Sequence, residues 1–184
     1  MTLDDLFAFF EGPGFGDNPH WRGCYCLAYH VEPGERFDEA DASTNRPAKA
    51  AQVRAEGGFG LLAYRKREVA GWCNVSPNSS LRALHSPDYG VASDASTATI
   101  VCFVVRPEQR RLGVARALLA AAPEYARSLG ATQLEAFPYP EPVPGNERLS
   151  SESRNYHGFA SMYRAAGFQE LGRAGRFLRM SLEL

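Results

Sequence analysis

The sequence lacks an apolar run long enough to cross a bilayer. Its longest runs, such as ATIVCFVV at residues 98–105, are far shorter than the about 20 residues that a membrane helix needs. It also lacks an excess of charge of either sign, because the formal net charge of the 184 residues is -1. Generic attraction to nucleic acids or to membranes is therefore not expected. The first residues, MTLDDLFAFF, lack the positive charge of a signal peptide, so we expect the protein in the cytoplasm.

Cysteine is scarce, with four residues at Cys24, Cys26, Cys73 and Cys102. All four lie in apolar, strand-like contexts, which favours free thiols in a reducing compartment over a disulfide framework. Cys24, Cys26 and His30 alternate along one candidate strand and would share one of its faces. Ligands spaced in this way spread apart instead of converging on an ion, so no metal site is expected. A metal or redox module built on these three residues is the alternative that a metal analysis would test.

Two common nucleotide-binding loops are also missing. The pattern GxxxxGK[ST] does not occur. After the apolar run, Gly113 is followed by Val114, Ala115 and Arg116, so GxGxxG does not occur there either. These absences exclude the usual kinase-type, GTPase-type and dinucleotide-binding interpretations.

The hydrophobic periodicity predicts one domain that contains both helices and strands. The nearly continuous apolar, β-branched run at residues 97–105 is typical of a strand buried on both faces. Pro123 lies inside an expected helix, where we predict a kink near Leu119 and not a break. The expected helices cover residues 2–10, about 47–56, 114–129 and 156–168. The expected strands cover residues 21–31, 97–105, 132–138, 169–173 and 176–184, and residues 59–75 are expected to form two strands joined by a tight turn at residues 65–68.

The segment QRRLGVA, residues 109–115, joins the apolar strand to the following helix. The N–H groups at a helix N-terminus attract anions, and Gly113, which has no Cβ, lets the backbone approach a bulky one. Arg110, Arg111 and Arg116 add charge-assisted donors. This pattern indicates a phosphate-binding site, and a pyrophosphate fits it better than a metal ion or a neutral sugar. The alternative is that Gly113 only makes the turn and that the arginines are solvated.

Two motifs make the sequence resemble the GNAT superfamily, the Gcn5-related N-acetyltransferases. The first is a strand that ends in Val105-Arg106-Pro107 and is followed by Arg110-Arg111-Leu112-Gly113-Val114-Ala115, which matches R/Q-x-x-G-x-G/A. The second is a helix that ends in Tyr163-Arg164-Ala165-Ala166-Gly167-Phe168, which matches Y-x-x-x-G-F. The resemblance is specific from about residue 97 to residue 168. It implies an α/β (α+β) fold over residues 1–184, with a single mixed, mostly antiparallel central sheet flanked by helices.

The resemblance also implies the acyl donor and the residues that hold it. Acetyl-CoA would lay its pantetheine arm along the backbone of the apolar strand and its pyrophosphate on the N–H groups of residues 111–115. Tyr163 would protonate the departing thiolate, unless it is an ordinary core tyrosine. The expected CoA-binding residues are Phe103, Val104, Val105, Arg110, Arg111, Leu112, Gly113, Val114, Ala115 and Arg116.

Acetyl transfer to an amine also needs a base, because a protonated amine cannot attack a thioester. Glu135 is the candidate: its sequence neighbours are apolar, and its strand lies close to the acetyl group in the family. The alternative is a surface glutamate. Weaker candidates are Asp88, Asp94 and His85. Cys102 is not favoured as a nucleophile, because its neighbours are apolar too.

The acceptor side is less defined by the sequence. Trp72, Asn74 and Trp21, with His20, are candidates for lining an acceptor pocket, although tryptophan is more often simply buried. The proline-rich loop at residues 138–155 would cover the acceptor. The predicted function is direct transfer of acetyl from acetyl-CoA to a primary amine of a small molecule or a protein terminus. The alternative is a CoA-binding sensor without catalytic activity. We expect no metal, nucleic-acid or membrane partner, and a homodimer is the assembly considered.

Overall fold

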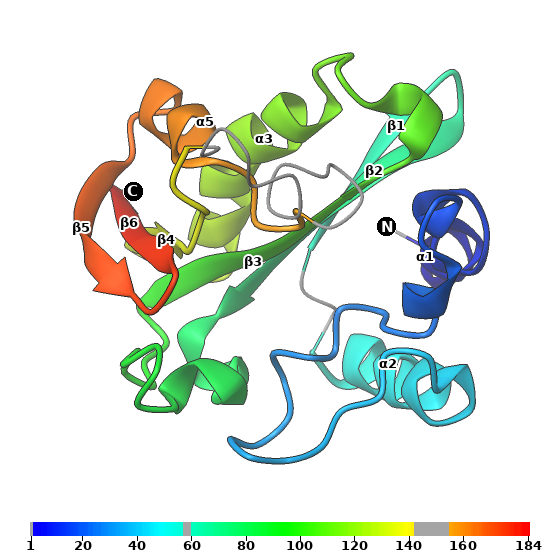
Figure 1. The fold of residues 1–184 in the computed structure, drawn as a ribbon, viewed down its shortest axis with the longest axis horizontal. Helices are drawn as coiled ribbons and strands as arrows, with labels where there is room; N and C mark the ends of the chain where they lie inside the picture. Colours follow the sequence, from blue (N-terminus) through cyan, green and yellow to red (C-terminus); the bar gives the residue numbers. More distant parts are fainter. Residues whose placement is uncertain (1, 57–59, 142–154) are drawn as a thin grey trace.

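The apolar run at residues 97–105 forms strand β3 (Thr97–Val105) in the middle of a six-stranded sheet (Figure 1). The computed structural model describes residues 2–56, 60–141 and 155–184. The strands stand in the order β1-β2-β3-β4-β6-β5, and every neighbouring pair is antiparallel except β3 and β4. This mixed, mostly antiparallel sheet confirms the expected fold class. The other strands are β1 (Leu61–Arg65), β2 (Glu68–Pro77), β4 (Gln133–Ala136), β5 (Gln169–Ala174) and β6 (Phe177–Glu183).

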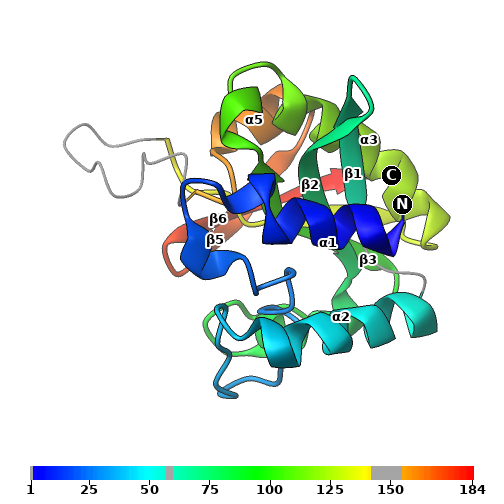
Figure 2. The same cartoon turned by 90° about the vertical axis from the view of Figure 1, so that its right-hand side faces the viewer.

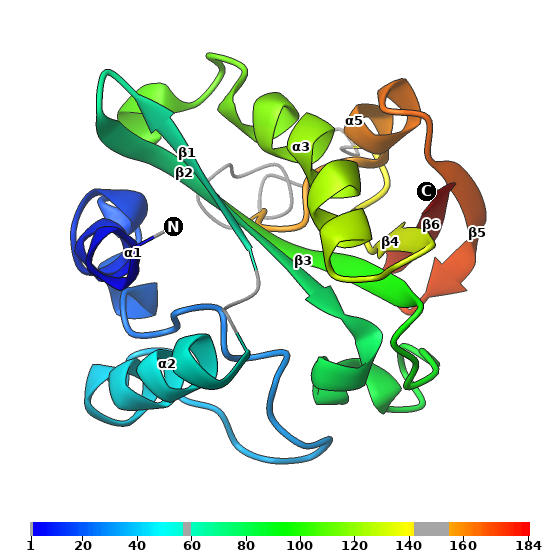
Figure 3. The ribbon, with the colours of Figure 1, turned by 180° about the vertical axis from the view of Figure 1, so that it is seen from behind.

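The helices cover both faces of the sheet (Figures 2 and 3). Helices α3 (Val114–Ser128) and α5 (Ala160–Ala165) pack on one face, and α1 (Leu3–Glu11) and α2 (Ala42–Glu56) lie on the other. Helix α3 faces the sheet with a buried apolar stripe that recurs every four residues, and it continues through Pro123 without a break. The stripe consists of Val114, Leu118, Ala122 and Ala126.

Strand β3 is buried on both faces, as its sequence predicted. Ile100 and Phe103 pack in the core cluster beneath α3, whereas Val104 packs in the cluster beneath α1. The strand therefore separates two cores, and each of them is closed by a different set of helices.

Strands β3 and β4 pair only along part of their length. Their parallel ladder ends where Ile100 pairs with Ala136, while β3 continues to Val105. A β-bulge at Val101 explains why, because Asn74 of β2 pairs with Cys102 and the next residue, Val75, already pairs with Ile100. A bulge of this kind bends its strand and increases the local twist. Among the described residues, the part of β3 beyond the bulge therefore pairs with β2 on one side and has no neighbouring strand on the β4 side.

Helix α3 approaches β2 closely at Gly71. A Cβ on this residue would lie 2.8 Å from Cγ1 of Val114, the first residue of the helix. The absence of a side chain therefore sets how near the N-terminus of α3 can come to the sheet.

The strand predicted at residues 21–31 is wrong. A short 3-10 helix at Pro19–Trp21 is followed by consecutive turns, in which Cys24 N–H bonds to the carbonyl of Trp21 and Leu27 N–H bonds to that of Cys24. Tyr25 and Cys26 have φ values of 43° and 54°, which a strand does not allow. Both side chains are buried against α1 and Trp72, so the apolar pattern reflects packing around these partners.

Glu135 of β4 forms a bidentate ion pair with Arg179 of β6. The guanidinium donates from Nη2 to Oε1 at 2.8 Å and from Nε to Oε2 at 3.0 Å. The glutamate side chain is only 4% exposed, whereas the arginine side chain is 32% exposed. This pair fastens β4 to β6 beside the point where β3 and β4 diverge.

We predict that Glu135→Gln lowers the free energy of unfolding by about 1–3 kcal/mol, because a neutral amide cannot replace the bidentate carboxylate. Urea denaturation followed by circular dichroism measures the change. The matched control is Glu183→Gln at the exposed end of β6, which should change stability by less than about 0.5 kcal/mol. Unchanged stability of the Glu135 variant would show that the ion pair does not hold the two strands together.

Candidate active site

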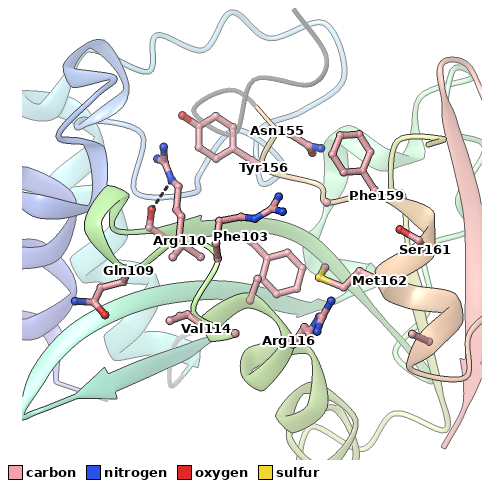
Figure 4. Close-up of a pocket in the computed structure, with 16 residues that line it drawn as sticks. Phe103, Gln109, Arg110, Val114, Arg116, Asn155, Tyr156, Phe159, Ser161 and Met162 are labelled. Carbon is pink, nitrogen blue, oxygen red and sulfur yellow. Dashed lines mark hydrogen bonds between the residues drawn. The ribbon is translucent and has the colours of Figure 1, made fainter. Parts of the chain in front are cut away.

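A pocket of about 550 Å³ opens beside the part of β3 that does not pair with β4 (Figure 4). Its walls come from the end of β3, the turn that follows it, the start of α3 and the segment from residue 155 to α5. The pocket is lined by Phe103, Val105, Gln109, Arg110, Arg111, Gly113, Val114, Ala115, Arg116, Asn155, Tyr156, Gly158, Phe159, Ser161, Met162 and Ala165.

Gly113 makes the turn into α3 with a left-handed backbone, at φ 85° and ψ 1°. A Cβ at this position would meet nothing within 4 Å, so the backbone conformation and not a lack of space calls for glycine. The first N–H groups of α3 have no helical acceptor, and Val114, Ala115 and Arg116 line the pocket. The helix dipole and these donors make this end of the pocket suitable for an anion.

Arg110 lines the pocket, but its guanidinium is engaged by the protein itself. It pairs with both carboxylate oxygens of Asp17, at 2.5 and 3.0 Å, and its Nε donates to the carbonyl of Val105 at 3.2 Å. The hydrogen bond from Arg110 lowers the pKa of the Asp17 carboxyl. The pair ties the N-terminal segment to the turn after β3, a role that the sequence did not indicate.

The backbone edge of β3 is also engaged. The N–H of Phe103 donates to the carbonyl of Tyr156 at 2.6 Å. The ring of Tyr156 lies against that of Trp21, with centroids 4.6 Å apart, and its hydroxyl accepts a hydrogen bond from Nδ2 of Asn18 at 3.1 Å. The segment that contains Tyr156 therefore lies along the edge where the pantetheine arm was expected.

The structure brings most of the predicted CoA-binding residues together. Val104 and Leu112 are the exceptions. Val104 is buried beneath α1, and Leu112 is 55% exposed and does not line the pocket. The predicted residues that do line it are Phe103, Val105, Arg110, Arg111, Gly113, Val114, Ala115 and Arg116.

Tyr163 lies directly behind the pocket wall. Its ring packs edge-on against Phe103 and Phe168, and its hydroxyl donates to the carbonyl of His157 at 2.8 Å. Burial raises the pKa of this hydroxyl well above its ordinary value. The neighbouring Met162 lines the pocket, whereas Tyr163 is not among the lining residues.

The other predicted catalytic residues do not line this pocket. Glu135 is bound at both oxygens by Arg179. His85 is hydrogen bonded through Nε2 to the carbonyl of Asn78 at 2.8 Å, and Asp94 accepts from the N–H of Thr97 at 2.7 Å. Asp88 is exposed and is likewise outside the lining.

The predicted acceptor residues lie on the α1 side of the sheet. Trp72 is fully buried there. Asn74 is also fully buried, and its Nδ2 donates to the carbonyl of Cys26 at 3.3 Å. Trp21 alone contacts the pocket wall, through Tyr156. The loop expected to cover the acceptor falls largely on residues 142–154, which lie outside the described residues.

The sequence analysis did not predict that the segment before α5 lines the pocket. Asn155, Tyr156, Gly158 and Phe159 line the pocket. His157, in the same segment, points the other way: its Nε2 lies 2.8 Å from the hydroxyl of Tyr29, and burial lowers its pKa to about 4. The imidazole is therefore neutral near pH 7. The signal in the sequence was the aromatic cluster NYHGF directly before the helix motif.

Two classes of feature do not occur in the part of the chain that is described. Among residues 2–56, 60–141 and 155–184, no three His, Cys, Asp or Glu side chains form a group that could hold a metal ion. In the same residues, no helix combines the length and the apolar character that crossing a bilayer requires.

Comparison with known proteins agrees with this geometry. The sequence model of the acetyltransferase (GNAT) family matches residues 21–146. No curated protein matches the sequence significantly. Three similar solved structures are a ribosomal-protein-alanine N-acetyltransferase from Brucella melitensis, the PaiA N-acetyltransferase from Thermoplasma acidophilum with coenzyme A, and YncA, a putative acetyltransferase from Salmonella typhimurium, with acetyl-CoA.

Each similarity extends over the whole chain at low sequence identity. The Brucella structure is 19% identical with a TM-score of 0.55, and the match covers 100% of this chain and 97% of the other. The PaiA structure is 13% identical with a TM-score of 0.54, and the match covers 100% of this chain and 96% of the other. The YncA structure is 16% identical with a TM-score of 0.53, and the match covers 100% of this chain and 91% of the other. These structures share the fold, and the family match extends over more than half of the sequence. The chain therefore belongs to the acetyltransferase (GNAT) family.

Proposed function

We propose that the protein transfers an acetyl group from acetyl-CoA to a primary amine of a small molecule or of a protein terminus. The observation that carries this proposal is the pocket in which the N-terminus of α3 meets the part of β3 that does not pair with β4. Two structures of similar fold contain coenzyme A or acetyl-CoA. The pocket suits such a molecule, because the anion-binding start of α3 lies beside the apolar side chains of Phe103, Phe159 and Met162.

The phosphate end of the donor would lie on the turn at residues 111–115. The N–H groups at the start of α3 would bind the pyrophosphate, and Arg111 and Arg116 line the same end of the pocket. We assign Arg110 a positioning role instead, because Asp17 already occupies both of its terminal nitrogens. The apolar side chains of Phe103, Phe159 and Met162 would line the path of the pantetheine arm.

The amine would attack the thioester carbonyl directly, without a covalent intermediate on the protein. The carbonyl oxygen gains negative charge during attack, and the N–H of Phe103 would stabilise it after its hydrogen bond to the Tyr156 carbonyl is released. Tyr163 would return a proton to the departing thiolate after its hydrogen bond to the His157 carbonyl is released. We propose that Glu135, held by Arg179, positions β4, and that the proton of the attacking amine passes to water.

One observation favours a second candidate, a CoA-binding sensor without turnover. The hydroxyl of Tyr163 and both carboxylate oxygens of Glu135 already have partners within the protein. Isothermal titration of CoA-stripped protein with acetyl-CoA, followed by an amine screen, distinguishes the two functions. Saturable binding with turnover supports the enzyme, and binding without turnover on any amine supports the sensor. Absence of binding by folded protein contradicts both.

We further propose a cytoplasmic protein that binds neither nucleic acid nor membranes. The near-neutral charge supports this, as do the four cysteines, which are free thiols. A homodimer would use β5, which forms one edge of the sheet and is mostly exposed along its length.

We predict that Gly113→Glu lowers the affinity for acetyl-CoA by at least about a hundredfold, because it strains the left-handed turn and places a carboxylate beside the pyrophosphate. Isothermal titration measures the loss. Gly130→Glu is the matched control, since Gly130 has the same φ of 85° and equally open surroundings near the other end of α3. Equal affinity of the two variants would overturn the pyrophosphate site.

We predict that Tyr163→Phe lowers kcat by about a hundredfold and leaves KM for acetyl-CoA within about threefold, because only the proton donor is lost. Steady-state kinetics on an active amine measures both constants. Tyr125→Phe is the control, since it also removes a hydroxyl hydrogen bond, with the N–H of Gly60. Tyr163 packs against Phe103 of the pocket lining, whereas the Tyr125 hydroxyl bonds to the segment before β1. If both variants lose the same activity, Tyr163 supports the structure and another group protonates the thiolate.

A further inference from the structure

Two thiols meet on the face of β3 that is turned away from α3. Cys26 comes from the N-terminal segment and Cys102 comes from β3, and both belong to the cluster beneath α1. The carbonyl of Cys26 accepts a hydrogen bond from Nδ2 of Asn74, and Asn74 pairs with Cys102 across β2 and β3, so both cysteines adjoin the same residue. Neither residue lines the candidate active site, so the acetyl transfer proposed above uses neither of them.

Cys26 is held from several directions. Its sulfur accepts a hydrogen bond from Nε1 of Trp72 at 3.2 Å, and its carbonyl accepts one from Nδ2 of Asn74 at 3.3 Å. Its backbone is left-handed, as is that of Tyr25 before it. Two successive non-glycine residues in this conformation store strain, which persists only where the surrounding contacts enforce it.

A buried cation lies beside this thiol. The side chain of Lys49 on α2 is fully buried, its ammonium donates to Oε1 of Gln52 at 2.8 Å, and it lies 5.6 Å from the ring centre of Trp72. Burying an ammonium group is unfavourable unless other groups stabilise its charge. A thiolate at Cys26 would provide the opposite charge in the same cluster.

The two thiols differ in their acidity. Burial alone would raise the pKa of Cys26, but the hydrogen bond from Cys102, the charge of Lys49 and the indole N–H of Trp72 hold it below the ordinary value. The hydrogen bond to Cys26 and burial raise the pKa of Cys102 well above its ordinary value. One member is therefore suited to attack an oxidant as a thiolate, and the other retains its proton.

We propose that Cys26 and Cys102 form a redox-active dithiol that hydrogen peroxide oxidises to a disulfide. The Cys26 thiolate attacks one peroxide oxygen, the O–O bond breaks, and the product is Cys26 sulfenic acid with one water after protonation. The Cys102 thiol then attacks the Cys26 sulfur, the S–O bond breaks, and a second water leaves. The two thiols lose two electrons in total, and both peroxide oxygens are reduced to water.

The disulfide would link the N-terminal segment to the strand that borders the active site. Cys102 directly precedes Phe103, whose side chain lines the pocket and whose N–H bonds to Tyr156. Oxidation would therefore fix the backbone of β3 at the point where it borders the pocket.

The test is peroxide treatment of the reduced full-length chain, followed by thiol counting and peptide mass spectrometry. We expect loss of two free thiols and a peptide pair that joins Cys26 to Cys102 and lacks two hydrogen atoms. Cys102→Ser should instead accumulate a sulfenic acid at Cys26 that dimedone captures. Cys24→Ser is the control and should form the disulfide at the wild-type rate, because desolvation raises the pKa of Cys24 to about 12.

Lys49→Met tests the role of the cation and should slow oxidation by about tenfold, because the thiolate loses its neighbouring charge. If this variant does not fold, peroxide oxidation of the wild-type chain still tests whether Cys26 and Cys102 form a disulfide. Persistence of both thiols, a Cys24–Cys26 disulfide, or sulfinic acid at Cys26 without a disulfide would each overturn the proposal.

Discussion

The site depends on one constraint, the divergence of β3 from β4 after Ile100 and Ala136. The extra residue at Val101 turns β3 away from its parallel neighbour, so the following backbone groups lose their partner strand β4 while Phe103 and Val104 remain buried. Buried backbone groups seldom stay unpaired. The edge at Phe103 must therefore be satisfied by something other than a strand, and this requirement creates a place for a ligand or for another segment of the chain.

In this structure the segment before α5 occupies that edge of β3, and residues of the N-terminal segment hold it in place. Tyr156 satisfies the N–H of Phe103, and Trp21 and Asn18 hold the side chain of Tyr156. Asp17 holds Arg110, whose Nε satisfies the carbonyl of Val105. The chain that covers one face of the sheet thus also controls the edge groups of β3. The same stretch supplies Cys26, so the thiol pair and the pocket are connected through a short length of backbone.

The parts of the fold that depend on local pattern were predictable from the sequence. The uninterrupted apolar run of β3 is a property of adjacent residues, and Gly113 marks the turn into α3. The pair of Arg110 with Asp17 joins residues 93 apart, and the bond between Phe103 and Tyr156 is made by backbone atoms that every residue carries. No local pattern encodes either contact. The prediction of a strand at residues 21–31 was wrong for a related reason. Buried side chains alternate along the sequence in these turns, which pack around Trp72, as they do in a strand.

The internal partners of β3 also determine where affinity for an acyl donor would arise. A donor that bonds to the N–H of Phe103 must replace a hydrogen bond that the protein already makes, so the exchange yields little net free energy compared with the about 1–3 kcal/mol lost if the group stayed unpaired. The N–H groups at the start of α3 have no helical acceptor, and no side-chain cap from Gly113 occupies them, so a pyrophosphate there would gain charge-assisted bonds. The phosphate end would then supply most of the binding free energy. The strand edge would contribute mainly by orienting the thioester, since an exchange of equal bonds fixes geometry while leaving affinity almost unchanged.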